Sequence, residues 1–195
     1  MKRKMSPRLA LVIIAAIFVL PLVLAYLMYS GSIEYNPVET RNLGTLLTPP
    51  VPVDLAGLET LPNGAQGLGD LEKHWVVLHR LPATCDTSCT EAVTALRQVH
   101  RATGRNQSRI RMLLLAPQRD EGLAERLHDI YPAFHLAVAE PQLLRELDGI
   151  PSAAGDTYLI DPLGNIMMRY AAGFDPNDLK KDLKRLLTWS KLDEQ

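Results

Sequence analysis

The sequence predicts a mixed α/β domain behind one N-terminal membrane-spanning helix. Three features predict it: an uncharged apolar run near the start, a Pro- and Gly-rich stretch after it, and short apolar strands alternating with amphipathic helices from residue 70 onward. The 195 residues suit one domain of about 150 residues plus an appendage. We expect a cytoplasmic basic head at 1–8, a transmembrane helix at 9–29, a tether with edge segments at 30–69 and the α/β domain at 70–192.

The uncharged run at residues 9–29 sets the expected location. Its 21 residues form a helix long enough to cross the roughly 30 Å apolar core of a bilayer. Residues 1–8 carry four Lys and Arg and no acid, which places the N-terminus in the cytoplasm and the domain outside it. A cleaved signal peptide is the alternative, but its apolar region is usually only about 7–15 residues long. The short basic head leaves no room for a mitochondrial presequence, so we expect a single-pass protein of a bacterial inner membrane, with a periplasmic domain.

The stretch at residues 30–69 contains prolines and glycines that disfavour long helices. Short apolar pieces within it, at 43–47 and 51–55, are typical of extended segments or edge strands that lie on a domain. We therefore expect a tether that contributes edge segments.

The pattern from residue 70 onward alternates between the two element types. Apolar runs and amphipathic spacing predict strands at 75–78, 110–116, 134–138, 157–160 and 166–170, and helices at 90–101, 121–131, 141–147 and from 175 onward. The DPLGN segment at 161–165 is a turn signal that joins the last two strands as an antiparallel hairpin. Helices should cover both faces of a central mixed sheet.

Composition excludes several classes of protein. The net charge of −1 argues against nucleic-acid binding, which requires clustered positive charge. Only two cysteines are present, which excludes a disulfide-dense scaffold and a Cys₄ zinc site. Glycine-rich phosphate loops, nucleophile elbows, HExxH motifs and EF-hand loops do not occur in the sequence.

The candidate chemistry lies at Cys85 and Cys89, between the first buried strand and the first helix. If the helix begins near Asp86, the two thiols share one face, about 6 Å apart at Cα, which a disulfide can bridge. The positive end of the helix stabilises a thiolate, the form that attacks disulfides and binds soft metals. We expect Cys85 at the exposed lip of the loop and Cys89 more buried. The alternatives are a static structural disulfide and two unrelated buried thiols.

The CxxxC spacing at a strand-to-helix junction resembles the Sco family of copper-handling, cytochrome-oxidase assembly proteins. The segment DLEKHWVVL at 70–78, the hairpin YLIDPLGN at 158–165 and a single membrane anchor are similar to that family too, over roughly residues 50–190. The resemblance implies a thioredoxin-like fold, with a central mixed sheet and helices on both faces. It also implies Cu(I) as a candidate cofactor and a cytochrome oxidase subunit or a Sco-type copper protein as partner.

The sequence departs from the family pattern at two places. Thr90 stands where Sco proteins have a proline after the second cysteine, and residues 149–156 contain no histidine where the family has its third copper ligand. Residues 149–152, GIPS, instead resemble the thioredoxin segment whose cis proline faces the cysteines, which makes Pro151 a supporting residue. His79, at the end of the strand before the cysteine loop, is the histidine best placed in sequence to replace the missing ligand.

Three functions therefore remain open. The first is membrane-anchored thiol–disulfide redox control during assembly of a respiratory oxidase copper centre, with Cys85 and Cys89 as a redox-active, catalytic pair. The second is a copper chaperone that uses both thiolates, with His79 as a further ligand. The third is a non-enzymatic assembly factor in which the cysteines form a structural disulfide. In each case lipid contacts residues 9–29 and no nucleic acid is bound.

Overall fold

The computed structural model describes residues 6–30, 41–55, 58–61, 71, 73–150 and 152–190. The chain divides into two compact units, Met1–Arg41 and Asn42–Gln195. Helix α1 (Pro7–Tyr29) occupies the first unit, and its Pro7–Leu27 portion has a mean hydropathy of 2.9. Within the described part of the chain, α1 is the one helix long and apolar enough to cross a membrane, which agrees with the span predicted at residues 9–29.

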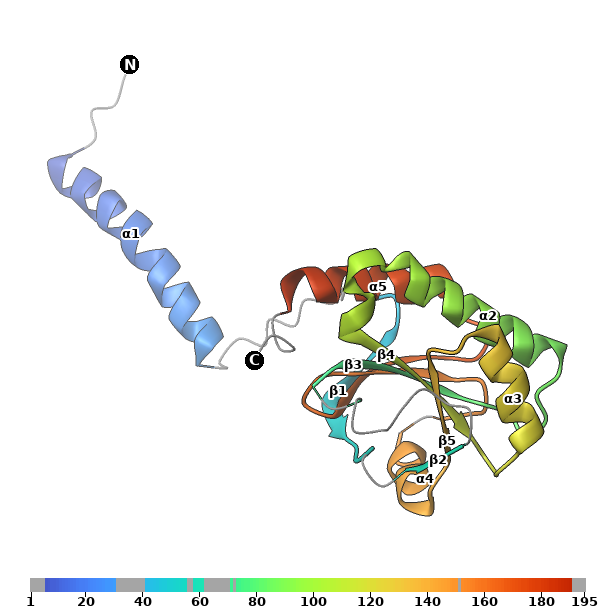
Figure 1. Cartoon of the computed structure of the whole chain (residues 1–195). Coiled ribbons are helices and arrows are strands. Elements are labelled where there is room, and N and C mark those ends of the chain that lie inside the picture. The colour runs from blue at the N-terminus through green and yellow to red at the C-terminus, as the bar shows by residue number, and fades with distance from the viewer. Residues whose placement is uncertain are drawn as a thin grey trace. The chain divides into compact units, whose positions relative to one another are not determined.

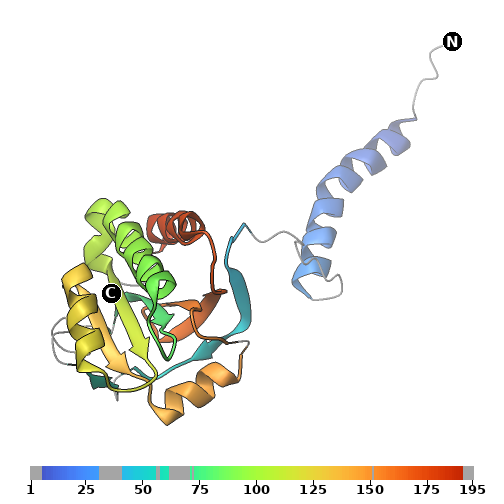
Figure 2. The same cartoon turned by 90° about the vertical axis from the view of Figure 1, so that its right-hand side faces the viewer.

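A seven-stranded mixed sheet lies at the centre of the second unit, and its strands follow the order β1-β7-β6-β3-β4-β5-β2 (Figures 1 and 2). The central strands β3, β4 and β5 run parallel, whereas β6, β7 and β1 follow antiparallel on one side and β2 on the other. The strands are β1 (Thr45–Pro52), β2 (Glu59–Thr60), β3 (Trp75–Arg80), β4 (Ile110–Ala116), β5 (Phe134–Val138), β6 (Thr157–Ile160) and β7 (Asn165–Tyr170). The predicted mixed sheet is confirmed.

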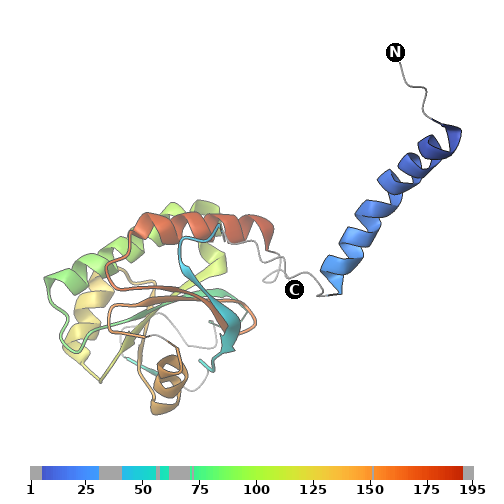
Figure 3. The same ribbon diagram turned by 180° about the vertical axis from the view of Figure 1, so that it is seen from behind.

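Helices cover both faces of this sheet, as the sequence predicts. Helices α2 (Thr87–Ala102), α3 (Glu121–Ile130) and α5 (Pro176–Trp189) contribute to one apolar core, while α4 (Pro141–Asp148) packs on the opposite face (Figures 1 and 3). A 3₁₀ segment, Gly104–Arg109, joins α2 to β4. The apolar side chains of β3 therefore alternate between two cores: Trp75 and Val77 belong to the core with α2, α3 and α5, and Val76 and Leu78 to the core with α4.

Two element boundaries near the cysteines differ from those expected. Strand β3 continues beyond residue 78 because His79 and Arg80 still pair with β4. Helix α2 begins at Thr87 instead of residue 90, because Asp86 caps it: the Asp86 carboxylate accepts a hydrogen bond from the Cys89 amide. Side-chain capping of this kind satisfies a backbone N–H that has no partner within the helix.

The segment expected as a tether supplies both edges of the sheet. Strand β1 pairs with β7, and the two-residue strand β2 pairs with β5. The segment has four prolines after the apolar piece at 43–47, at positions 49, 50, 52 and 62, and the first three lie within β1 or at its end. Proline is tolerated there because an edge strand leaves half of its N–H groups outside the ladder.

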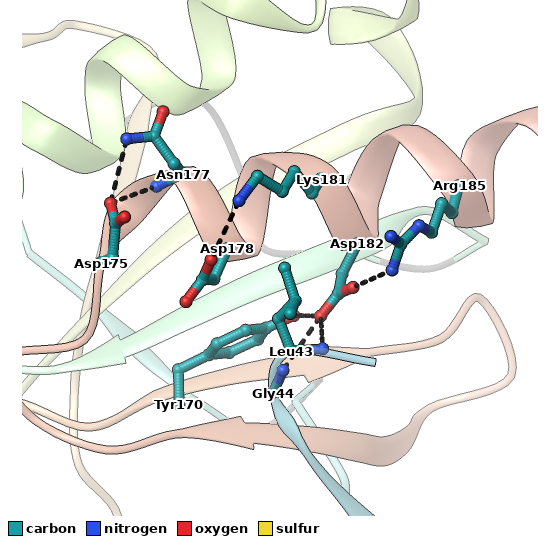
Figure 4. A network of polar contacts seen from close by, with 9 residues as sticks. All are labelled: Leu43, Gly44, Tyr170, Asp175, Asn177, Asp178, Lys181, Asp182 and Arg185. Atoms are coloured by element: carbon teal, nitrogen blue, oxygen red, sulfur yellow. Dashed lines mark hydrogen bonds and ion pairs between the residues drawn. The ribbon is translucent and has the colours of Figure 1, made fainter. Parts of the chain in front are cut away.

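A buried carboxylate holds the start of the second unit against α5 (Figure 4). Asp182, only 1% exposed, accepts hydrogen bonds from the amides of Leu43 and Gly44 at 2.9 and 3.0 Å and from the Tyr170 hydroxyl at 2.9 Å. Arg185 lies 3.4 Å from its second oxygen. Glycine is required at position 44, since a Cβ atom there would lie 2.6 Å from the Tyr170 ring.

Candidate functional site

Cys85 and Cys89 form a disulfide at the start of α2, with their Cα atoms 5.1 Å apart. Cys85 lies in the loop between β3 and α2 and is partly exposed, whereas Cys89 is 5% exposed and belongs to the core beneath α2. A reagent or partner therefore reaches the Cys85 sulfur first. The relative exposure of the two side chains is the one that the sequence predicts.

Asp86 lies between the cysteines and organises the first turn of α2. Its Oδ1 atom accepts a hydrogen bond from the Cys89 amide at 3.0 Å and another from the Ser88 hydroxyl at 2.7 Å. Its backbone carbonyl accepts the first helical bond, from the Thr90 amide at 3.1 Å. The Ser88 hydroxyl and then the Cys89 amide lower the pKa of the Asp86 carboxyl, so this group is ionised at neutral pH.

His79 is buried beneath α2 instead of facing solvent. It is 2% exposed, and its Nδ1 atom lies 2.9 Å from the Thr157 hydroxyl on the neighbouring strand β6. Burial lowers its pKa from 6.5 to about 4, against the opposing attraction of Asp156. The imidazole is neutral at pH 7 and borders a cavity of about 60 Å³, together with Ala92 and Leu96 of α2.

The residues before β6 form the loop in which the resemblance to Sco proteins implies a histidine that this sequence lacks. Residues 152–156 follow the end of β3: the Arg80 amide donates to the Asp156 carbonyl at 2.9 Å and the Gly155 amide to the Arg80 carbonyl at 2.7 Å. Gly155 has a φ of 86°, a conformation that glycine adopts without a steric cost. This pairing fixes the loop beside the strand that leads to the cysteines. Pro151, the expected supporting residue, lies outside the described residues.

A polar network that sequence reasoning missed fills this loop. Asp156, 1% exposed, accepts from the amides of Ala153 and Ala172 at 2.8 and 2.9 Å and pairs with Arg169 Nε at 2.8 Å. The Tyr158 hydroxyl donates to Ser152 Oγ at 2.7 Å.

Arg80 donates to the same Ser152 Oγ atom at 2.7 Å, which joins the end of β3 to this loop. The ion pair with Asp156 raises the pKa of Arg169, and burial raises that of Tyr158. Tyr158 is fully buried, as is usual for a core aromatic residue, and no local sequence signal marks its hydroxyl or Asp156 as network members.

The described residues contain no group of three or more His, Cys, Asp or Glu side chains arranged to hold a metal ion. The geometry thus brings the two cysteines together and leaves His79 bonded to Thr157. The thiol donor set in the reduced protein consists of two sulfurs, without the third ligand of a Cys₂His site.

A family model described as the transmembrane-like, thioredoxin-like, C-terminal domain matches residues 75–190, which is more than half of the chain. The chain belongs to this family. The transmembrane-like, thioredoxin-like family model covers the cysteine loop, the closing hairpin and α5. Together with the apolar helix α1, it indicates a membrane-anchored protein. No protein of curated function matches the sequence.

Solved structures with this fold include several Sco proteins. The apo Sco1 protein of Thermus thermophilus is 19% identical, with a TM-score of 0.55 over 77% of this chain and 99% of that one. Copper-bound ScoI of Arabidopsis thaliana is 13% identical, with a TM-score of 0.52 over 70% of this chain and 100% of that one.

BsSco, a Sco-family cytochrome c oxidase assembly protein with a disulfide switch, is 11% identical, with a TM-score of 0.52 over 77% of this chain and 98% of that one. At such identities the likeness establishes the fold. The predicted thioredoxin-like fold is confirmed.

Proposed function

We propose that this chain is a membrane-anchored thiol–disulfide oxidoreductase that sets the redox state of cysteines in a copper protein during assembly of a respiratory oxidase. The observation that carries the proposal is the Cys85–Cys89 disulfide at the start of α2, with a partly exposed first sulfur and a buried second one. Redox-active pairs need this asymmetry because one sulfur meets the client and the other resolves the mixed disulfide. The oxidase and copper parts of the proposal draw on the Sco neighbours.

The proposed exchange passes two electrons from the cysteine pair to the client. In the reduced protein the Cys85 thiolate attacks a client disulfide, which forms a mixed disulfide and releases one client thiolate. The Cys89 thiol then loses its proton and attacks the Cys85 sulfur, which restores the Cys85–Cys89 bond and releases the second client thiolate. The client gains two electrons and the pair loses two, so a dithiol donor must reduce the pair again for the next cycle. The structure corresponds to the oxidised end of this cycle.

Trapping of clients by single-cysteine chains tests the proposal. Cys89→Ser leaves Cys85 without its resolving partner and should accumulate mixed disulfides, which mass spectrometry of affinity-purified complexes identifies. Cys85→Ser leaves a buried thiol and should trap almost nothing, so it serves as the matched control. Equal trapping by both variants, or a pair that stays oxidised below about −300 mV in a redox titration, would favour a structural disulfide.

Copper is a cargo for which the donor set is incomplete. The two thiolates of the reduced pair suit Cu(I), since soft sulfur ligands select it, but His79 is held by Thr157 and residues 152–156 contain no histidine. We expect Cu(I) affinity below that of a Cys₂His site. Ala153→His should strengthen binding more than Ser152→His, because Ser152 accepts bonds from Arg80 and Tyr158. Stoichiometric Cu(I) held by the natural chain against a strong chelator would contradict this.

The proposed location is a bacterial inner membrane, with the N-terminus in the cytoplasm and the second unit in the periplasm. The basic residues before α1 support this orientation. A reporter that is active only outside the cytoplasm should work when fused after Gln195. Activity of a cytoplasm-only reporter at that position would reverse the orientation.

A further inference from the structure

The first turn of α2 carries a negative charge between the two cysteines. Asp86 is the only charged residue from Leu81 to Thr90. Its carboxylate is exposed to solvent and accepts from both the Cys89 amide and the Ser88 hydroxyl. The carboxylate thus satisfies a backbone N–H at the start of the helix that would otherwise be available to stabilise a nearby anion.

This placement sets two electrostatic effects against each other at the Cys85 sulfur. The positive end of α2 favours a Cys85 thiolate, as at other reactive cysteines at helix starts. The Asp86 carboxylate, one residue away, disfavours the thiolate through like-charge repulsion. It also accepts the hydrogen bond of the Cys89 amide, which is then not available to the thiolate. Like charges on adjacent residues near the surface repel each other, which raises the pKa of the thiol.

The charged groups of the neighbouring elements are already engaged with other partners. Arg80, at the end of β3, donates to Ser152, and Arg169 of β7 pairs with Asp156. His79 is neutral at pH 7, and Glu91, further along α2, adds charge of the same sign as Asp86. Asp86 is therefore the charge that bears most directly on Cys85.

We propose that Asp86 is a positioning residue that holds the Cys85–Cys89 pair toward its disulfide form by destabilising the Cys85 thiolate. This inference rests on the proposed redox function. The relevant equilibrium is disulfide plus two glutathione molecules giving dithiol plus glutathione disulfide, so that two electrons and two protons pass from glutathione to the pair. Removal of the carboxylate shifts this equilibrium toward the dithiol wherever Cys85 ionises.

The first test measures the thiol itself. The full-length Cys89→Ser chain in detergent, with and without Asp86→Asn, is alkylated across a range of pH, and the rate gives the pKa of the Cys85 thiol. Asparagine caps helices as well as aspartate does and can accept from the residue 89 amide, so α2 is retained. We expect Asp86→Asn to lower the pKa of Cys85 by about half a unit to one unit. An unchanged pKa would overturn the proposal.

Helix α3 offers a matched control. Asp120 caps it with the same type of hydrogen bond, its Oδ1 atom accepting from the amide three residues on, that of Leu123, at 2.9 Å, and no cysteine follows. Asp120→Asn should leave the pKa of Cys85 unchanged. An equal fall in both variants would overturn the proposal, because it would show a general effect of charge removal.

The second test uses the chain with both cysteines in glutathione buffers at pH 9 and pH 6. Both pH values are set from the pKa of Cys85 that the first test measures; pH 9 and pH 6 apply if they lie at least about one unit above and two units below it. At the higher pH we expect Asp86→Asn to shift the equilibrium about threefold to tenfold toward the dithiol, or about 15–30 mV. At the lower pH the Cys85 thiol is protonated with either residue at position 86, and the shift should vanish. A shift of equal size at both pH values would assign the effect to helix capping and overturn the proposal.

The two tests separate this inference from the proposed function. If the natural pair resists reduction below about −300 mV, the redox function fails, while alkylation of the single-cysteine chain still decides the role of Asp86. If the natural pair titrates in the ordinary range but Asp86→Asn changes neither readout, only the role of Asp86 fails.

Discussion

Asp156 and Asp182 form two matched sites at different places in the domain. Each carboxylate is 1% exposed, accepts hydrogen bonds from two backbone amides and faces one arginine. A tyrosine hydroxyl also lies near each: that of Tyr170 donates to Asp182 at 2.9 Å, whereas that of Tyr158 lies 3.4 Å from Asp156 and donates to Ser152. The two sites also differ in the arginine: Arg169 lies 2.8 Å from Asp156 and is 21% exposed, whereas Arg185 lies 3.4 Å from Asp182 and is 49% exposed.

The difference shows what each site does. Asp156 fixes the loop beside the end of β3, near the cysteine loop, with a close ion pair. Asp182 fixes the start of β1 on α5, mainly through neutral donors. In both cases a buried carboxylate stabilises backbone that belongs to no regular element, because its oxygens satisfy amides that no strand or helix would satisfy.

The largest effect is expected for Asp156→Ala. The substitution leaves Arg169 without its counter-ion and two amides without acceptors, and removal of one partner of a buried pair costs about 3–5 kcal/mol. Urea unfolding of the full-length chain in detergent measures the loss. Asp156→Asn, which keeps an acceptor, should lose less. A cost below about 1 kcal/mol for the alanine variant would show that the site is not structurally important.

Acid should destabilise the folded protein, because the buried His79 resists protonation in the folded state. Burial lowers the pKa of His79 to about 4 from 6.5, so the unfolded chain binds a proton below pH 6.5 that the folded chain refuses until about pH 4. Stability is therefore full above pH 6.5 and falls by about 3 kcal/mol as the pH drops to 4.

Unfolding at pH 7 and pH 4.5 measures this dependence, and His79→Gln should flatten it. His100→Gln is the control, because burial lowers the pKa of His100 as well. This variant should lose only the contribution of His100 to the acid sensitivity and keep that of His79. If the His79→Gln chain keeps the full acid sensitivity, the dependence has another source.

A smaller loss is expected for Asp182→Ala, about 2 kcal/mol, because Arg185 is half exposed and water replaces its partner. The substitution should also have a local effect: hydrogen exchange of the Leu43 and Gly44 amides should become faster, since both lose their acceptor. Asp182→Asn should preserve most of the protection. Unchanged exchange in the alanine variant would mean that β1 is held by its pairing with β7 alone.

The smallest effects are expected for the two tyrosine hydroxyls. Tyr170→Phe removes a 2.9 Å bond to the Asp182 carboxylate, and Tyr158→Phe removes a 2.7 Å bond to the neutral Ser152 hydroxyl. Bonds to charged acceptors are worth more, so we expect losses of about 1.5 and 1 kcal/mol respectively. The reverse order in parallel urea titrations would show that the Ser152 network contributes more than the Asp182 site.

Sequence reasoning recovered the elements whose burial is local. Strands β4, β5 and β6 are mostly apolar runs flanked by turn residues, and their boundaries match the expected ones. The cysteine pair was evident from its spacing and its place before an amphipathic helix. In such segments the residues that decide the structure are neighbours in the chain.

The sequence could not predict features that depend on distant partners. Asp182 lies on a lysine-rich helix, and its burial depends on amides 138 and 139 residues away. His79 looks available as a ligand until β6 brings Thr157 against it. The sequence suggested a helix start near Asp86, but not the hydrogen bonds that the Asp86 carboxylate accepts from the Cys89 amide and the Ser88 hydroxyl.

The two margins of the sheet have a consequence for association between copies of the protein. In the described structure β2 is two residues long, and β1 carries three prolines and an irregular register against β7. A neighbouring chain that tries to extend the sheet at either margin finds too few backbone donors in line. Copies confined to one membrane at high local density can therefore collide repeatedly without joining strand to strand.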